Sequence, residues 1–402
     1  MSHDDEGSVP ATTIAGIALA TALVPLNSTM IAVALPDIAH DFDISKGRAS
    51  VLITLYLAAM LVGQPLAGRF CDVVGARRLA IISSAGFGLC SAAAMGAGTF
   101  WLLVAFRGLQ AAFAAGLVPS VHAMLREVVP DDERGRAFGV QGSVLGAGAG
   151  LGPLIGGVVT AAFGWRAIFG VNLPLVLAVL YVLRRRVSAS APSAEPTTTV
   201  VTRGSARIFN RVFTAAFSAQ ALSTFAQYAL LLSVPLVLDS RGWSAASSGV
   251  ALSFLTLGMV LMGPYGGRLG DAYGRRRPVV LGLTVTVFAV LMSAVAGDAV
   301  ASAVLIITLL LFGIGLGVAT PSLTTAGIEA VPRARVGSAA GLLSASRYVG
   351  SIASTLVLAT VVSDDGSGLA LLLGVCILLL CVSVVVARQL PAQRAGLPEL
   401  AR

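Results

Sequence analysis

The chain has 402 residues, of which 56% are hydrophobic and only 11% are charged. A soluble domain carries about 25% charged residues, so a chain this poor in charge could not cover the surface of a soluble fold. The formal net charge of +8 comes from basic residues in short clusters between apolar runs. This distribution argues against a nucleic-acid-binding protein, which would gather its basic residues in one stripe or tail.

Long apolar segments follow one another along nearly the whole chain. Crossing a bilayer takes about 20 mostly apolar residues, because the hydrocarbon core is about 30 Å thick. The runs are continuous and lack the alternation of barrel strands, so we predict helices. The sequence predicts twelve spans, over residues 13–35, 48–70, 79–99, 101–124, 136–161, 167–184, 211–238, 246–268, 278–297, 300–325, 337–362 and 368–388.

The N-terminal residues 1–10 are acidic and polar, and they lack the basic start of a cleaved signal peptide. We therefore expect the first apolar run to remain as a membrane helix. Most arginines fall in the loops that a cytoplasmic N-terminus would place inside the cell, whereas Lys46, Arg48, Arg166 and Arg241 fall in the opposite loops. This asymmetry predicts a multi-pass cell-membrane protein with both termini in the cytoplasm.

One polar stretch, residues 187–206, is rich in Ser, Thr, Pro and Ala and divides the chain in two. The predicted domains are a cytoplasmic tail, a six-helix bundle, a cytoplasmic linker, a second six-helix bundle and a second cytoplasmic tail. Their boundaries are residues 1–12, 13–186, 187–206, 207–388 and 389–402.

The two halves repeat one another in sequence. The loop from Gly68 to Arg78 follows the second span, and the loop from Gly267 to Arg277 follows the eighth with Gly, Asp, Gly and paired arginines in register. A second repeat pairs Val129-Pro130, Gly135 and Gly139 with Val331-Pro332, Gly337 and Gly341. A repeat of six spans predicts an all-α membrane protein of two pseudo-symmetric bundles, which rock around a central site.

Several strings match the signatures of one transporter family. They are Gly68-x-x-x-Asp72-x-x-Gly75-x-Arg77-Arg78, Arg107-Gly108-Leu109-Gln110, Gly148-x-x-x-Gly152-Pro153-x-x-Gly156-Gly157, Trp165 to Pro174, and Leu26-Asn27-Ser28-Thr29 followed by Val33-Ala34-Leu35-Pro36. On these residues the chain resembles the major facilitator superfamily, and within it the drug:proton antiporters. The resemblance implies the major facilitator fold and multidrug efflux by alternating access. It is closest to a subfamily whose members usually have fourteen helices.

The chain departs from that subfamily at two points. The linker has no room for two further helices. Asn27 stands where the subfamily usually has Asp, an acid that is a plausible proton carrier in the relatives. Proton coupling is therefore left open by the sequence.

The loop that follows the second span is the first candidate functional element. Its glycines permit a tight turn, and its acid can lie at the N-terminus of a neighbouring helix, where the dipole favours negative charge. By the resemblance, this gating loop latches the cytoplasmic side through Gly68, Asp72, Gly75, Arg77 and Arg78, with Asp271 and Arg276 as second-half counterparts. The alternative is an ordinary basic loop that only sets the orientation.

The glycines of the fifth span form the second candidate element. Small residues at i, i+4 and i+8 allow close helix packing, and the proline can kink the helix. The residues of this antiporter motif are Gly148, Gly152, Pro153, Gly156 and Gly157. The alternative is packing without a gating role, and a dinucleotide-binding loop is excluded because no strand precedes the glycines.

Two arginines fall inside predicted spans, Arg107 in the fourth and Arg347 in the eleventh. A charge at mid-membrane costs at least about 2.5–3.5 kcal/mol on insertion scales, so it normally faces a polar cavity or a partner. Each arginine could bind an anionic group or tune a nearby acid. The alternative is a structural arginine satisfied by backbone carbonyls.

Polar side chains in the spans predict the lining of a substrate cavity. The seventh span carries four on one helical face, Gln220, Thr224, Gln227 and Tyr228, and the first-half spans add Asn27, Gln64, Gln110 and Gln141. Amides, a hydroxyl, an aromatic ring and apolar walls suit an amphipathic organic compound. The alternative is hydrogen bonding between helices.

The sequence places no acid at mid-membrane, and the nearest candidates for a coupled-proton carrier are Asp37, at the outer end of the first span, and Glu329, at the inner end of the tenth. We take Asp37 as the better candidate. Its alternative role is that of an interfacial acid.

Other classes of protein find little support in the sequence. It contains no catalytic constellation, metal-ligand spacing or cofactor motif, and its four cysteines and His122 are interpreted as structural. We predict a monomeric secondary active transporter that exports small organic compounds in exchange for protons and is embedded in the lipid bilayer. The alternatives are an uncoupled facilitator or importer of a metabolite, and a non-transporting scaffold or sensor.

Overall fold

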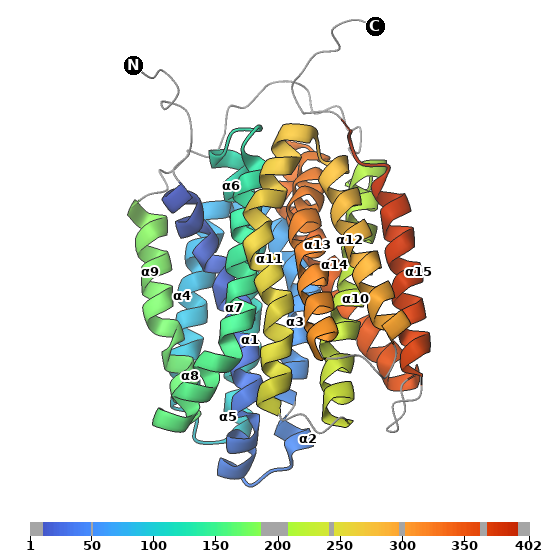
Figure 1. The fold of residues 1–402 in the computed structure, drawn as a ribbon. Helices are drawn as coiled ribbons and strands as arrows, with labels where there is room; N and C mark the ends of the chain where they lie inside the picture. Colours follow the sequence, from blue (N-terminus) through green and yellow to red (C-terminus); the bar gives the residue numbers. More distant parts are fainter. Residues whose placement is uncertain are drawn as a thin grey trace, which may run out of the picture. The chain divides into compact units, whose positions relative to one another are not determined.

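The computed structural model describes residues 11–49, 51–185, 208–240, 245–296, 302–361 and 368–392. Over these ranges the chain forms helices and no strand (Figure 1). In chain order the helices are α1 (Ala11–Asp41), α2 (Lys46–Ala49), α3 (Val51–Val74), α4 (Ala76–Met95), α5 (Phe100–Ala114), α6 (Leu117–Val128), α7 (Arg134–Phe163), α8 (Ala167–Gly170), α9 (Asn172–Arg185), α10 (Arg211–Ser240), α11 (Ala245–Tyr273), α12 (Arg276–Ala296), α13 (Ser302–Glu329), the 3-10 helix η2 (Arg333–Arg335), α14 (Val336–Val361) and α15 (Leu369–Ala387).

The predicted all-α membrane fold is confirmed, and every predicted span corresponds to a helix or to a pair of consecutive helices. Within the described residues, ten helical segments are long and apolar enough to cross a membrane. The fourth predicted span is α5 followed by α6, which together give one apolar segment, Phe100–Val128. The two predicted spans outside the ten correspond to α10 and α14, which are 30 and 26 residues long.

Several helix ends differ by a few residues from the predicted spans, and two differences change the local structure. Helix α1 continues to Asp41, past the predicted end of its span at residue 35, and includes Pro36. Asp37 consequently lies inside a helix rather than at its end. The sixth span is interrupted at Val171, between the short α8 and α9.

The chain divides into two compact units, which do not follow the two halves of the sequence strictly. The first unit contains the helices up to Val128, the segment Gly148–Asn210 and also Val331–Ala345. The second contains Val129–Ala147, Arg211–Ala330 and the residues from Ser346. Each unit thus includes the beginning of a long helix, α14 or α7, from the other half of the sequence. The linker at 187–206 and most of both tails lie outside the described residues, so the predicted domain boundaries stay a prediction.

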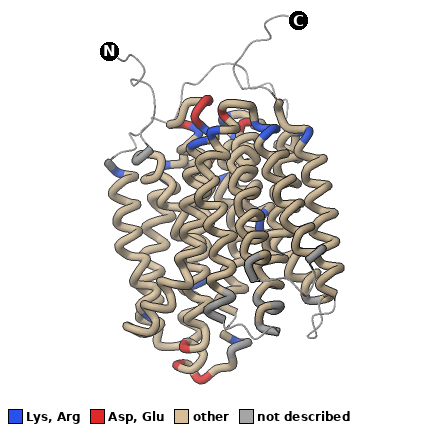
Figure 2. Tube along the Cα trace, in the orientation of Figure 1, with Lys and Arg blue, Asp and Glu red and all other residues tan. Residues whose placement is uncertain are grey.

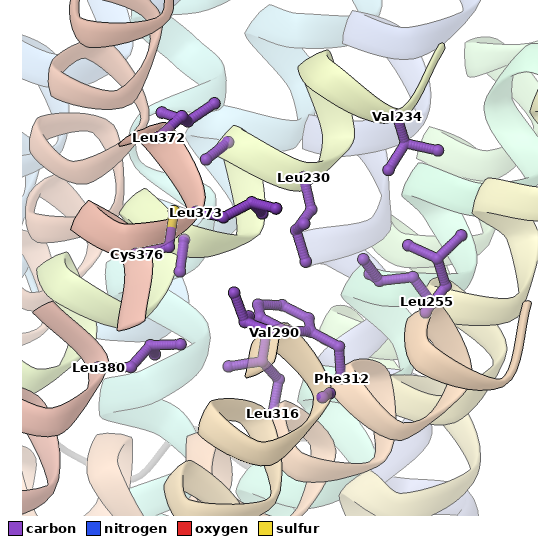
Figure 3. Packing of buried hydrophobic residues seen from close by; sticks show 14 of the residues in the cluster. Leu230, Val234, Leu255, Val290, Phe312, Leu316, Leu372, Leu373, Cys376 and Leu380 are labelled. Carbon is purple, nitrogen blue, oxygen red and sulfur yellow. The ribbon is translucent and has the colours of Figure 1, made fainter. Parts of the chain in front are cut away.

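Each unit has its own apolar core. In the first unit Met30, Ile31, Leu52, Leu103 and Phe169 pack together from α1, α3, α5 and α8. The core of the second unit joins α10, α11, α12, α13 and α15, and its labelled side chains point toward one another in Figure 3. Charged residues gather near the helix ends, with long uncharged stretches between them, as Figure 2 shows. This is the distribution that a bilayer imposes on its spanning helices.

Candidate functional site

A buried polar cluster surrounds Arg107 on α5 in the first unit. The Arg107 side chain is 0% exposed. Its Nη1 donates hydrogen bonds to Oδ1 of Asn27 on α1 and, at 2.7 Å, to Oε1 of Gln110. Its guanidinium carbon lies 4.1 Å from the centre of the Tyr56 ring on α3. The structure therefore brings together Asn27, Arg107 and Gln110, which the sequence had placed on two different spans.

Further hydrogen bonds extend this cluster to two more helices. Gln110 Nε2 donates to Ser91 Oγ on α4 at 2.6 Å, and Asn172 Nδ2 on α9 donates to the same oxygen at 3.3 Å. The hydroxyl of Tyr56 donates to the carbonyl of Val24 at 3.1 Å. Sequence reasoning missed Tyr56, Ser91 and Asn172 as members of the cluster. Of these three residues only Asn172 could have been found from the sequence, because it belongs to the signature segment from Trp165 to Pro174.

The positive charge of Arg107 has no carboxylate partner among the described residues. The interactions of the guanidinium are with two amide oxygens and one aromatic ring. Within the described ranges, its Nε and Nη2 have no hydrogen-bond partner. A desolvated cation–π contact contributes about 2 kcal/mol, which does not replace an ion pair for a charge taken out of water. The first unit thus holds an uncompensated cation in its interior.

The second unit carries the polar face predicted on α10. Gln220 and Thr224 are buried, whereas Gln227 and Tyr228 are half-buried. Gln227 Nε2 lies 3.4 Å from Met259 Sδ on α11, which is a weak contact. Arg347 on α14 is half-buried and close enough to Tyr228 to interact with it electrostatically. In the described part of the chain Arg347 forms no ion pair.

The other predicted lining residues are more scattered. Gln64 on α3 is 0% exposed, with its Nε2 3.7 Å from Met60 Sδ. Gln141 is buried in the part of α7 that belongs to the second unit. Asp37 is exposed on α1, and its nearest charged neighbour in sequence, Asp41, pairs with Arg166 at 2.8 Å. The structure does not place Gln64 or Asp37 in the Arg107 cluster.

Asp72, the acid of the first gating loop, lies at the N-terminus of α14. Its Oδ1 accepts the Gly337 N–H at 2.6 Å, and its Oδ2 accepts the Ser338 N–H at 2.9 Å and the Ser338 hydroxyl. All of these residues belong to the first unit. A carboxylate in this position satisfies otherwise unpaired amides and interacts favourably with the helix dipole.

Asp271 makes the equivalent contact in the second unit, at the N-terminus of α7. Its two oxygens accept the N–H groups of Gly135 and Arg136, both at 2.8 Å. It also pairs with Arg275 Nη1 at 2.6 Å, and Arg275 Nη2 pairs with Glu329 on α13 at 2.9 Å. Burial by itself lowers the pKa of Arg275, but the hydrogen bonds and charges of Glu329 and Asp271 raise it above its usual value.

The arginines of the two loops make contacts that differ from those predicted from the sequence. The sequence pointed to Arg276, but the structure places Arg275 beside Asp271, and the contact found for Arg276 is from its N–H to the Pro391 carbonyl at 3.1 Å. In the first loop Arg77 does not reach Asp72; it donates to the carbonyls of Leu183 and Arg184 at the end of α9. Arg78 is exposed. Ala76 occupies the position that corresponds to Arg275 in the repeat, so the first loop has no arginine at the position that pairs with the acid in the second loop.

The glycines of the repeat allow the helices to approach closely at these contacts. Gly75 and Gly274 have φ of 92° and 81°, a backbone region that other residues rarely adopt. A side chain at Gly68 would overlap the backbone of Gly337, and one at Gly267 would overlap the backbone of Gly135. The acids can reach the helix N-termini only because these positions lack a Cβ.

The glycine motif of α7 packs against α1 within the first unit. Cβ atoms at Gly148, Gly152 and Gly156 would meet Ala22, Thr29 and Met30 in turn. Gly157 faces Val33 at a looser distance, 3.9 Å, and Pro153 is exposed. The i, i+4, i+8 glycines therefore form the close-packed stripe, whereas Pro153 and Gly157 lie beside it.

A cavity of about 230 Å³ lies next to the Asp271 cluster in the second unit. Its charged lining residues are Asp131, Asp132, Asp271, Arg275 and Glu329. Among the described residues no group of three or more His, Cys, Asp or Glu side chains could hold a metal ion.

Comparison with known proteins agrees with this architecture. The family model of the Major Facilitator Superfamily matches residues 17–355. "Uncharacterized MFS-type transporter YvkA" of Bacillus subtilis is 28% identical over 86% of this chain and 89% of its own length. The "Tetracenomycin C resistance and export protein" of Streptomyces glaucescens is 27% identical over 88% of this chain and 76% of its own length.

A solved structure shows the same fold. The proton:xylose symporter XylE superposes with a TM-score of 0.73 at 13% identity, over 93% of this chain and 94% of its own. The family model and the relatives identify the protein as a multi-pass membrane transporter and not an enzyme. The chain belongs to the major facilitator superfamily.

Proposed function

We propose that the protein is a secondary active transporter of the cell membrane that exports amphipathic organic compounds in exchange for protons. The observation that carries this proposal is the match over most of the chain to a relative named as a resistance and export protein. A second relative, the "Multidrug efflux pump LfrA" of Mycolicibacterium smegmatis, is 37% identical over 44% of this chain. Amphipathic substrates fit the mixture of buried amides and apolar walls in both units.

The substrate is bound or coupled through the polar residues of the spans. We assign this role to Asn27, Asp37, Gln64, Arg107, Gln110, Gln141, Gln220, Thr224, Gln227, Tyr228 and Arg347. Asp72 and Asp271 act as cytoplasmic latches, since each joins a loop of one sequence half to the first turn of a helix from the other half. Each latch contributes only a few kcal/mol, because a stronger one would hold the carrier in one state.

Transport by purified protein in liposomes tests the proposal. A pH gradient is imposed and the lumenal pH is followed while cationic, neutral and anionic amphipathic compounds are added in turn. Proton flux that depends on one compound class is the expected result. If no compound moves and no proton flux appears in any condition, the proposal is wrong.

One observation favours a second candidate, an uncoupled facilitator or importer. Among the residues that the structure describes, Arg107 contacts an amide, Asn27, and forms no ion pair with a carboxylate that could carry a proton. In the same liposomes a facilitator would show counterflow of a compound without any change in lumenal pH.

A further inference from the structure

Each unit holds an arginine well inside a spanning helix, Arg107 in the first and Arg347 in the second. Neither forms an ion pair among the described residues. The acids near the helix ends are mostly engaged elsewhere: Asp41 pairs with Arg166, and Asp271 and Glu329 pair with Arg275. Among the described residues, the positive charges of Arg107 and Arg347 are therefore not balanced by an ion pair with a carboxylate.

The unpartnered atoms of Arg107 have a specific geometry. Its Nη1 is occupied by Asn27 and Gln110, whereas Nε and Nη2 have no partner in the part of the chain that the structure describes. These two nitrogens form one edge of the planar guanidinium, and their N–H bonds run parallel. This is the edge that binds the two oxygens of a carboxylate or sulfonate bidentately.

The surroundings hold this edge in a fixed orientation. Tyr56 packs on the face of the guanidinium, 4.1 Å from its carbon, and its own hydroxyl is held by the Val24 carbonyl. Gln110 is in turn fixed by Ser91. A donor pair that is buried, oriented and unpartnered favours an acceptor that brings negative charge with it.

We infer that the transported compound carries an acidic group, and that this group is the counter-ion that Arg107 lacks. The inference rests on the proposed transport function and narrows its substrate class to amphipathic anions, such as aromatic carboxylates and sulfonates. An inorganic anion such as chloride offers the same charge, so the experiment includes it. Arg107 is 0% exposed in this conformation, and the anion reaches it when alternating access opens the cluster.

Asn27 has a role in this arrangement. An aspartate at this position would place a permanent carboxylate on Arg107 and would compete with a bound anion. The amide orients Nη1 without neutralising the charge. Asn27→Asp is therefore the sharpest test, because it leaves the arginine in place and supplies the missing charge from within the protein.

The probes are three compounds on one ring system: 2-naphthoate, 2-naphthamide and 2-naphthylmethylammonium. Binding to the full-length purified protein is measured from the change in Tm with ligand concentration, in a buffer of low ionic strength that contains no chloride, carboxylate or sulfonate. The wild type is expected to bind the naphthoate at least tenfold more tightly than the naphthamide, a difference of about 1.4 kcal/mol. Arg107→Gln and Asn27→Asp are each expected to abolish this preference, and Arg107→Lys to retain part of it.

Arg166→Gln is the matched control, because Arg166 already pairs with Asp41 and should not affect the choice between probes. A wild type that prefers the neutral or the ammonium probe overturns the inference. So does a naphthoate preference that survives in both Arg107→Gln and Asn27→Asp. Asn27→Asp keeps the arginine, so its result stands even if Arg107→Gln fails to fold.

Two further measurements distinguish an organic from an inorganic anion, and the failure of this inference from the failure of the proposed transport function. If chloride but not the naphthoate raises the Tm of the wild type, and neither raises that of Arg107→Gln, the site binds anions but its ligand is inorganic, and the inference of an acidic organic substrate is wrong. If proteoliposomes move the ammonium probe but not the naphthoate, the inference is wrong and the proposed transport function stands. If they move none of the three probes, the inference is wrong, and the wider compound panel then decides the transport function.

Discussion

Single side chains decide which charges in this protein are compensated. Asp271 and Arg275 pair at 2.6 Å, and Glu329 binds the other side of the same arginine. Asp72, in the equivalent loop, is held by backbone amides and a hydroxyl instead. The two loops therefore look alike in sequence but differ in charge balance, because Ala76 occupies the position that corresponds to Arg275.

This asymmetry leads to a prediction for Asp271→Asn. The substitution weakens two charge-assisted bonds to the first turn of α7 and removes one of the two acidic partners of the buried Arg275. We expect the purified protein to lose about 1–3 kcal/mol of stability, seen as a lower Tm. Asp132→Asn, which changes an exposed acid nearby, should alter stability by less than about 0.5 kcal/mol. An unchanged Tm for Asp271→Asn would show that the contact does not stabilise the protein.

Asp37 is the residue on which proton coupling can be tested. It is exposed on α1 and is separate from the Arg107 cluster. If it carries the coupled proton, Asp37→Asn should abolish pH-driven transport while counterflow of the same compound continues. The measurement is lumenal pH and compound uptake in the same proteoliposomes. Intact pH-driven transport in this variant would remove Asp37 from the coupling mechanism.

At the scale of helices, glycines determine where two helices can cross. Gly139 lies against the backbone of Gly263 and Pro264 on α11, whereas Gly142, one turn further along α7, has nothing within 4 Å of its Cβ position. The same helix therefore contains one glycine that the packing requires and one that it does not.

These two glycines predict opposite effects of the same substitution. Gly139→Ala forces α7 and α11 apart and should destabilise the protein by about 1–3 kcal/mol. Gly142→Ala should stabilise it by about 0.5–1 kcal/mol, because alanine loses less conformational entropy in a helix. Thermal unfolding of both variants under the same conditions is the measurement. Equal effects of the two substitutions would contradict the close approach at Gly139.

At the scale of the whole molecule, the arginine distribution predicts the orientation in the membrane. Ser45 lies between α1 and α2, and Asp132 lies between α6 and α7; both are exposed. A cytoplasmic N-terminus places Ser45 outside the cell and Asp132 inside.

Labelling with a membrane-impermeant maleimide checks this orientation. Cys381, the exposed native cysteine, is first replaced by serine to lower the background. Ser45→Cys should then react in intact cells, and Asp132→Cys only after permeabilisation. The reverse pattern would invert the predicted topology.

The sequence by itself determined the class of fold. Twenty or so apolar residues in a row can lie in a bilayer only as a helix, so local composition was enough to predict the spans. The internal repeat likewise pointed to the two loops predicted to gate, to their acids Asp72 and Asp271, and to the glycines that face them. The predicted helix ends differed from the observed ones: α1 continues to Asp41 because Pro36 is accommodated within the helix.

Only the tertiary structure decided which side chains meet. That Asn27 binds Arg107, that Ser91 and Asn172 complete the cluster, and that Arg275 rather than Arg276 pairs with Asp271 all depend on how the helices are rotated about their axes. Rotation is set by close packing of many side chains from distant parts of the sequence, and hydropathy carries no record of it. The sequence therefore shows that a spanning segment contains Arg107 and no acid at the same depth. The structure shows that the Nε and Nη2 edge of this arginine lacks a hydrogen-bond partner among the described residues.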